Sequence, residues 1–156
     1  HTMKYQKLLS GGRMPMVGYG TFLALDLELE NALNNALEAG YRYIDTASGY
    51  GNEHVIGKVL NEWISSGKVT RDELFIVTKL PAYGNQAEDV EKYIKKSLKD
   101  FQLEYLDMYL VHLPFGVFKD NKVEYSDMKR DDGTDHVSVW KVRKYTTFRQ
   151  DIICIE

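Results

Sequence analysis

Short, almost wholly apolar segments alternate along this chain with segments whose apolar residues recur at helical spacing. The apolar segments span residues 17–21, 41–46, 74–80 and 105–111, and a helical pattern follows each of the first three. Near-continuous apolar strands joined by amphipathic helices are typical of a parallel sheet. The pattern therefore predicts an α/β fold built from about four βα units.

Turn and capping residues mark the expected ends of these elements. A glycine-rich turn at residues 10–13 predicts a hairpin before the first unit. Asn52 is expected to cap the second helix. Asn85 with Glu88 resembles a capping box for the third helix.

The alternation stops after Pro114. Residues 116–133 are polar, which predicts a long loop. Asp135 to Lys144 is predicted to begin a helix with Val137 and Trp140 on its inner side, and the rest of the chain resumes no clear βα pattern.

Composition excludes several classes of protein. The chain has 156 residues, of which 44% are hydrophobic and 28% charged, which suits one soluble globular domain. A net charge of -3 gives no electrostatic footprint for nucleic acid. A single cysteine fits a reducing compartment, and no apolar stretch is long enough to span a bilayer. We therefore expect a cytoplasmic protein with no nucleic-acid or membrane partner.

Ionisable residues close three successive predicted strands. Counting every second residue along these strands leads to Asp45, Lys79 and His112, and Tyr50 lies in the loop after the second strand. The carboxyl ends of parallel strands are where ligands bind in α/β folds. The joint pattern predicts that these four side chains converge at one site.

Each residue taken alone has a structural interpretation as well. Asp45 fits a turn or a helix cap, Lys79 fits a side chain that extends to solvent, and His112 fits a hydrogen-bonded residue at the rim. No cysteine or histidine cluster has the spacing of metal ligands, so no metal is expected.

The four side chains together suit proton transfer to an oxygen. A phenol titrates near 10, a neighbouring ammonium lowers that pKa, and a carboxylate holds the ammonium in place. A neutral imidazole can hydrogen-bond a substrate oxygen. Such a set fits protonation of a developing alkoxide while hydride reaches carbon, and hydride implies a nicotinamide cofactor.

Five segments resemble a known family, in the correct order and at the correct separations. They are MPMVGYGT at 14–21, ALEAGYRYIDTA at 36–47, YGNE at 50–53, LFIVTKL at 74–80 and YLDMYLVHLP at 105–114. Over residues 4–142 the chain resembles the aldo-keto reductases. The resemblance implies a (β/α)8 barrel that reduces aldehydes and ketones to alcohols by hydride transfer from NADPH.

The resemblance also implies catalytic roles for the four residues. Tyr50 would be the general acid, and Lys79 would lower its pKa. Asp45 would pair with Lys79, and His112 would orient the carbonyl group of a small-molecule substrate.

Cofactor contacts follow by position in the same way. Gly20, Thr21 and Phe22 would lie beside the nicotinamide end of NADPH and the substrate mouth, with Asp45 also at the cofactor. The family holds the rest of NADPH with a serine–asparagine pair, a stacking aromatic and a basic cluster, none of which has a counterpart here.

The resemblance covers only the N-terminal half of a barrel. Residues 4–142 are expected to form an N-terminal hairpin and about four βα units, and residues 143–156 a divergent tail. Because four strands leave two edges open and an inner face of Tyr, Phe, Val and Met side chains uncovered, we expect self-association and little turnover by the isolated chain. The alternative is a non-catalytic interaction protein that pairs through these edges.

Overall fold

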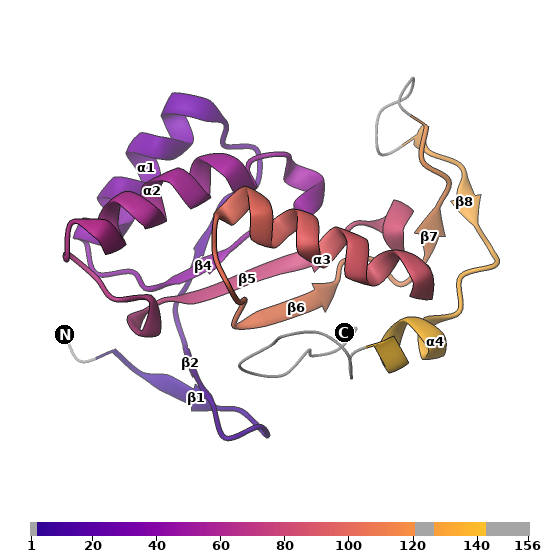
Figure 1. Ribbon diagram of the computed structural model, residues 1–156, viewed down its shortest axis with the longest axis horizontal. Helices are drawn as coiled ribbons and strands as arrows, with labels where there is room; N and C mark the ends of the chain where they lie inside the picture. The colour runs from indigo at the N-terminus through magenta and orange to yellow at the C-terminus, as the bar shows by residue number, and fades with distance from the viewer. Residues whose placement is uncertain (1–2, 121–126, 143–156) are drawn as a thin grey trace.

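A four-stranded parallel sheet forms the centre of the computed structural model, which describes residues 3–120 and 127–142 (Figure 1). Its strands lie in chain order: β3 (Tyr19–Gly20), β4 (Tyr43–Asp45), β5 (Phe75–Leu80) and β6 (Met108–Val111). The antiparallel hairpin of β1 (Tyr5–Lys7) and β2 (Arg13–Pro15) precedes the sheet. The predicted α/β class and N-terminal hairpin are therefore confirmed.

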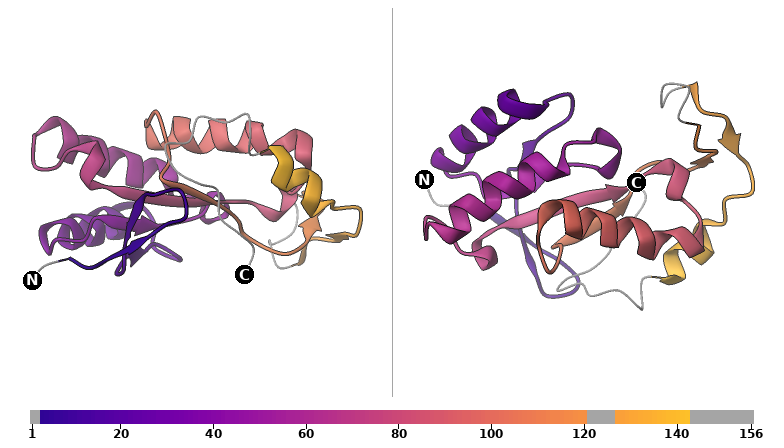
Figure 2. Two further views of the ribbon diagram at one scale, coloured as in Figure 1. Left: turned by 90° about the horizontal axis from the view of Figure 1, so that it is seen from below. Right: turned by 45° about the horizontal axis from the view of Figure 1, so that its top comes forward.

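Three helices pack side by side and connect the strands (Figure 2). They are α1 (Asp26–Glu38), α2 (Glu53–Ser65) and α3 (Ala87–Phe101). Their apolar faces share one buried cluster with strand residues such as Ile44, Ile76 and Leu80. Gly57 lets α2 approach α3 closely, because a Cβ there would lie 2.6 Å from the Phe101 Cα atom. Short 3-10 helices η1 (Ser48–Tyr50), η2 (Arg71–Glu73) and η3 (Ala82–Gly84) lie beside the strand ends.

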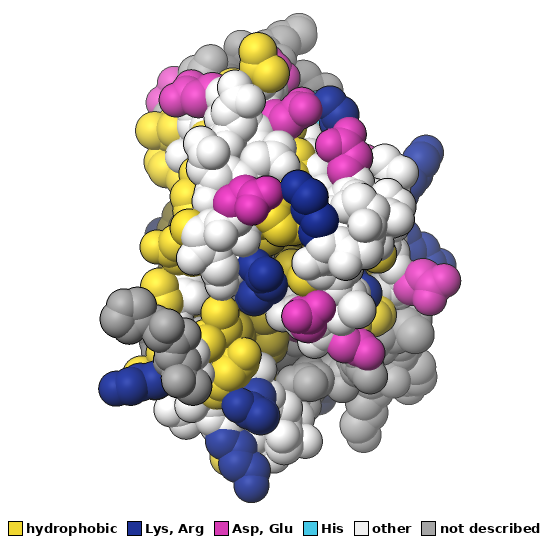
Figure 3. Space-filling model, turned by 90° about the vertical axis from the view of Figure 1, so that its left-hand side faces the viewer, with side chains coloured by type: hydrophobic (Ala, Val, Ile, Leu, Met, Phe, Trp, Pro, Cys, Tyr) yellow, Lys and Arg dark blue, Asp and Glu magenta, His cyan; other side chains and the backbone are white. Residues whose placement is uncertain are grey.

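The inner face of the sheet is not left uncovered. Phe75, Val77 and Met108 are 4%, 0% and 5% exposed, and the hairpin region contributes Leu8 and Met14 to the same cluster. The expectation that this face exposes its apolar side chains is therefore wrong for Phe75, Val77 and Met108, whereas Tyr43 and Leu110 in the same cluster stay partly exposed. Figure 3 shows hydrophobic side chains on one face of the molecule. Most of the exposed large apolar side chains are close to β3 in the sequence. Those that flank β3 are Met16, Val17, Phe22, Leu23, Leu25 and Leu27.

The region after Pro114 differs from the prediction in two ways. The predicted loop contains an antiparallel pair, β7 (Gly116–Val117) with β8 (Arg130–Asp131). The predicted helix is α4 (His136–Lys141), but Val139 is its buried residue, whereas Val137 is 62% exposed. The predicted tail at residues 143–156 lies outside the described residues.

The capping box forms at a different place from the predicted one. α3 begins at Ala87 with Gln86 as its N-cap, and the buried Asn85 donates a hydrogen bond from Nδ2 to Leu113 O (3.3 Å). Thr70 and Glu73 form a capping box at η2 instead. None of the helices in the described part of the chain is long and apolar enough to cross a membrane.

Candidate active site

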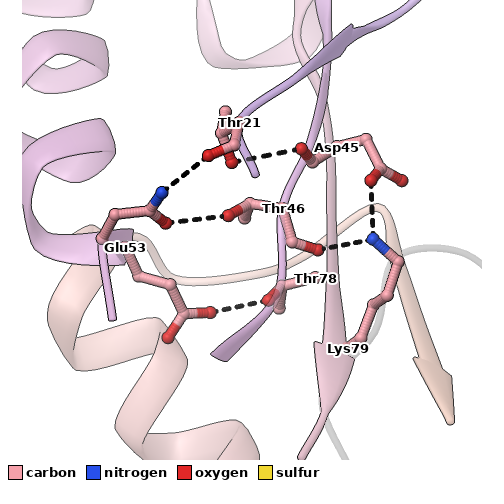
Figure 4. A network of polar contacts seen from close by, with 7 residues as sticks. Thr21, Asp45, Thr46, Glu53, Thr78 and Lys79 are labelled. Atoms are coloured by element: carbon pink, nitrogen blue, oxygen red, sulfur yellow. Dashed lines mark hydrogen bonds and ion pairs between the residues drawn. The ribbon is translucent and has the colours of Figure 1, made fainter. Parts of the chain in front are cut away.

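Asp45 and Lys79 form an ion pair across neighbouring strands. The Lys79 Nζ atom donates to Asp45 Oδ1 at 2.6 Å and to the Thr46 carbonyl oxygen at 2.9 Å (Figure 4). Asp45 ends β4 and lies opposite Val77 of β5, so Lys79 follows two residues further toward the carboxyl end. The Lys79 side chain is 14% exposed, which places its charge where screening by water is weak.

Tyr50 lies among the other predicted site residues. Its ring centroid is 5.6 Å from the ring centroid of His112 and 5.6 Å from the Lys79 Nζ atom. The Phe22 ring also packs against the Tyr50 ring, and the centroids of these two rings are 4.9 Å apart. The structure thus brings Asp45, Tyr50, Lys79 and His112 together, while their catalytic roles stay predictions.

The pKa of Tyr50 shifts in the direction opposite to the expected one. Burial raises it first, and the negative charge of Asp45 raises it further. The Lys79 ammonium is held against the Asp45 carboxylate, which offsets its positive charge at the phenol. Tyr50 is therefore a neutral phenol at neutral pH, the protonation state that a general acid needs.

His112 is neutral for related reasons. Burial lowers the pKa of the imidazole, and the Lys79 charge lowers it further, while Asp45 acts in the opposite direction. A neutral ring can still donate one N–H to a substrate oxygen.

Tyr43 is a neighbour of Asp45 to which the sequence assigned no role. Burial, the Asp45 charge and a hydrogen bond with Asp45 raise the pKa of Tyr43 to about 12. Its place on the same strand face as Asp45 was visible in the sequence, but ten other tyrosines offered no reason to select it.

The predicted cofactor residues differ in accessibility. Thr21 is 1% exposed, and its hydroxyl is within 3.4 Å of the Asp45 carbonyl oxygen. Phe22 is 65% exposed, and a side chain at Gly20 would meet nothing within 4 Å. The space beside Gly20 is therefore open, and the Phe22 ring is accessible beside Tyr50. Among the described residues, no group of three or more His, Cys, Asp or Glu side chains is placed to hold a metal.

A buried carboxyl group beneath the site was not anticipated. Glu53 is 2% exposed at the start of α2, and it accepts hydrogen bonds from Thr78 Oγ1 (2.6 Å) and Ser97 Oγ (3.1 Å). These contacts join α2 to β5 and α3. Burial is the largest cause of its raised pKa, and the two hydrogen bonds only partly oppose it.

The raised pKa of Glu53 makes a pH-dependent contribution to stability. The contribution of Glu53 to the free energy of unfolding is fully present below the ordinary glutamate pKa of about 4.3. It is lost as the pH rises through the raised pKa of Glu53 in the folded state. The side chain of Glu53→Gln stays neutral at every pH. As the pH rises across that window, the free energy of unfolding of Glu53→Gln should therefore increase relative to that of the wild type by up to about 1.4 kcal/mol per pH unit. Denaturant unfolding followed by circular dichroism between pH 4 and 8 measures this difference, with the exposed Glu62→Gln as control. Parallel pH profiles for wild type and Glu53→Gln would contradict the assignment.

Known proteins resemble this chain over most of its length. The model of the Aldo/keto reductase family matches residues 18–139. Aldo-keto reductase family 1 member A1 of Mus musculus is 44% identical over 138 residues, which cover 86% of this chain and 42% of that protein. The Xenopus tropicalis protein of the same name is 35% identical over 149 residues, covering 89% and 44%.

A solved structure agrees with these matches. The Bombyx mori aldo-keto reductase AKR2E4, crystallised in complex with NADP, superposes with a TM-score of 0.80 at 32% identity and covers 92% of this chain and 46% of that one. The chain spans less than half the length of these relatives, so its fold is part of a (β/α)8 barrel, as predicted. The chain belongs to the aldo-keto reductase family.

Proposed function

We propose that this chain carries the catalytic groups of an NADPH-dependent reductase that converts aldehydes or ketones to alcohols. The observation that supports it is the position of Tyr50, a neutral phenol with the His112 ring on one side and the Lys79–Asp45 ion pair on another. A neutral proton donor beside an ammonium–carboxylate pair and a neutral imidazole fits the needs of carbonyl reduction.

Each of these groups has a distinct part in the proposed reaction. His112 holds the carbonyl oxygen by a hydrogen bond, and Tyr50 passes its proton to that oxygen as negative charge develops. Lys79 stabilises the resulting phenolate, and Asp45 keeps the ammonium charged and oriented. NADPH, when bound, supplies the hydride that adds to the carbonyl carbon, so hydride and proton together yield the alcohol.

Only the nicotinamide end of the cofactor finds suitable residues in the described part of the chain. Gly20 offers space, Phe22 an exposed ring, and Asp45 a carboxylate at the strand end. We propose that groups for the remainder of NADPH come from the barrel portion that the longer relatives possess.

The test compares the isolated chain with a completed chimera, in which residues 1–142 are followed by the remaining C-terminal portion of the mouse relative. NADPH oxidation with a simple aldehyde, followed by absorbance, should be slow for the chain alone and readily measured for the chimera. A folded chimera that binds NADPH without reducing any aldehyde or ketone would contradict the proposal.

Association through the sheet edge is a second candidate function. Among residues 3–120 and 127–142, β3 is an edge strand of the sheet, and exposed apolar side chains that include Met16 and Val17 lie next to it, a surface that favours contact with another chain. Light scattering at micromolar concentration should show a mass above that of a monomer, and Val17→Lys should reduce it. A monodisperse monomer would exclude this function.

A further inference from the structure

Asn52 occupies the N-cap position of α2 without capping it. An asparagine there normally accepts a hydrogen bond from a backbone N–H of the first turn, but this side chain makes no such bond. Its Nδ2 donates to the carbonyl oxygens of Thr21 (2.9 Å) and Ala24 (3.0 Å), and its Oδ1 accepts from Thr46 Oγ1 (3.1 Å). Asn52 is 1% exposed, so it ties the β3–α1 and β4–α2 loops together from inside the protein.

The β3–α1 loop that Asn52 holds is strained. Leu23 has a φ of 64° while its side chain is 79% exposed, so no burial of that side chain favours the left-handed conformation. Two carbonyl groups that flank Leu23 are the ones that accept from Asn52. The same loop carries Phe22, whose ring packs 4.9 Å from that of Tyr50. Asn52 therefore bonds to the backbone on both sides of Phe22.

The Asn52 Oδ1 atom is connected to Lys79 through Thr46. Thr46, whose hydroxyl donates to Asn52, accepts from the Lys79 Nζ atom with its carbonyl oxygen (2.9 Å). Its own backbone N–H donates to Val77 O (3.0 Å). Figure 4 shows Thr21, Thr46 and Lys79 in this continuous polar network. The Asn52 side chain is thus bonded to groups that hold two of the three neighbours of the Tyr50 ring, Phe22 and Lys79.

We propose that Asn52 is a positioning residue for Tyr50, acting through the strained turn at Phe22 on one side and through Thr46 and Lys79 on the other. The role in reduction rests on the function proposed above, whereas the control of Tyr50's surroundings does not. Asn52 does not contact the reacting atoms and is not itself catalytic.

Asn52→Asp tests the idea in the chain as it exists, because it removes both donors and places negative charge against two carbonyl oxygens. Asn61→Asp is the matched control, since Asn61 on the same helix also donates from Nδ2 to two carbonyl oxygens, those of Gly57 (2.7 Å) and Phe101 (2.9 Å). The readout is NMR of ring-labelled tyrosine, with the Tyr50 signal assigned by its loss in Tyr50→Phe. We expect Asn52→Asp to lose the Phe22–Tyr50 ring contacts and to shift the Tyr50 titration by about half a pH unit or more.

Asn61→Asp should leave the Phe22–Tyr50 ring contacts and the Tyr50 titration unchanged, although this variant also loses stability. The comparison therefore separates positioning of Tyr50 from general destabilisation. If Asn52→Asp does not fold, the milder Thr46→Val removes one bond of the network and should weaken the Phe22–Tyr50 ring contacts. An unchanged Tyr50 environment in the folded variants, or an equal change in Asn61→Asp, overturns the proposal.

The completed chimera links this to catalysis. There, Asn52→Asp should lower kcat by about 10- to 100-fold with little change in KM, the result of a misplaced acid. A wild-type chimera without activity would refute the reductase function and leave the NMR result standing. An active chimera whose kcat is unaffected by Asn52→Asp would refute the positioning role alone.

Discussion

Replacing Tyr50 by phenylalanine in the completed chimera should lower kcat about 10²- to 10⁴-fold, the usual contribution of a general acid. The variant keeps the ring that packs against Phe22 and His112 and removes only the hydroxyl group. Substrate and cofactor contacts therefore persist, so KM and the NADPH dissociation constant should change little. Steady-state kinetics and fluorescence titration with NADPH measure these quantities.

The matched control is Tyr5→Phe, which removes a phenolic hydroxyl from an exposed residue of the β1–β2 hairpin. It should keep the kcat of the chimera. If Tyr50→Phe retains more than about a tenth of that kcat, the proton must come from another donor, and the proposed role of Tyr50 is wrong.

The convergence of the site was predictable because it depends on topology and periodicity alone. Parallel strands in chain order bring Asp45, Lys79 and His112 to one edge, whatever the details of packing. Tyr50 follows a strand by only a few residues, so its loop lies at the same edge. No side-chain contact had to be known for this prediction.

The electrostatics of the site depend on distances that the sequence does not contain. A lysine near Tyr50 was expected to lower the pKa of the phenol, but burial and Asp45 raise it. The outcome depends on Lys79 being only 2.6 Å from Asp45, so that the pair presents little net charge. Residue types alone do not show which of these opposing effects on the Tyr50 pKa is larger.

Polar residues with partners remote in sequence were missed for a similar reason. Glu53 bonds to Thr78 and Ser97, which are 25 and 44 positions away. Asn52 was read as a local cap, since local hydrogen bonds are the ones a sequence pattern suggests. Counting every second residue back from His112 also predicts Leu106 on the inner face, but β6 begins only at Met108, and Leu106 packs in the helix-side cluster.

The largest loss of stability is expected at the opposite end of the sheet from the site. Arg71 of η2 and Asp107, just before β6, form an ion pair at 2.7 Å with side chains 16% and 8% exposed. Asp107 Oδ2 also accepts from the backbone N–H of Ile76 in β5 (2.9 Å). The pair therefore connects the amino ends of the neighbouring strands β5 and β6.

Arg71→Met should lower the free energy of unfolding by about 3–5 kcal/mol, because it removes one partner of a buried ion pair and with it the Arg71 charge beside the Asp107 carboxylate. The exposed pair Lys58–Glu30 provides the control: Lys58→Met leaves Glu30 in contact with water and should change the free energy of unfolding far less than Arg71→Met does. Denaturant unfolding measures both values. The double variant Arg71→Met/Asp107→Asn also removes the negative charge of Asp107, and it keeps a side-chain oxygen that can accept from the Ile76 N–H. It should therefore recover part of the loss. A double variant no more stable than Arg71→Met would mean that the loss comes from other contacts of Arg71, such as its hydrogen bonds to the carbonyl oxygens of Leu74 and Tyr105 and its stacking over the Tyr105 ring.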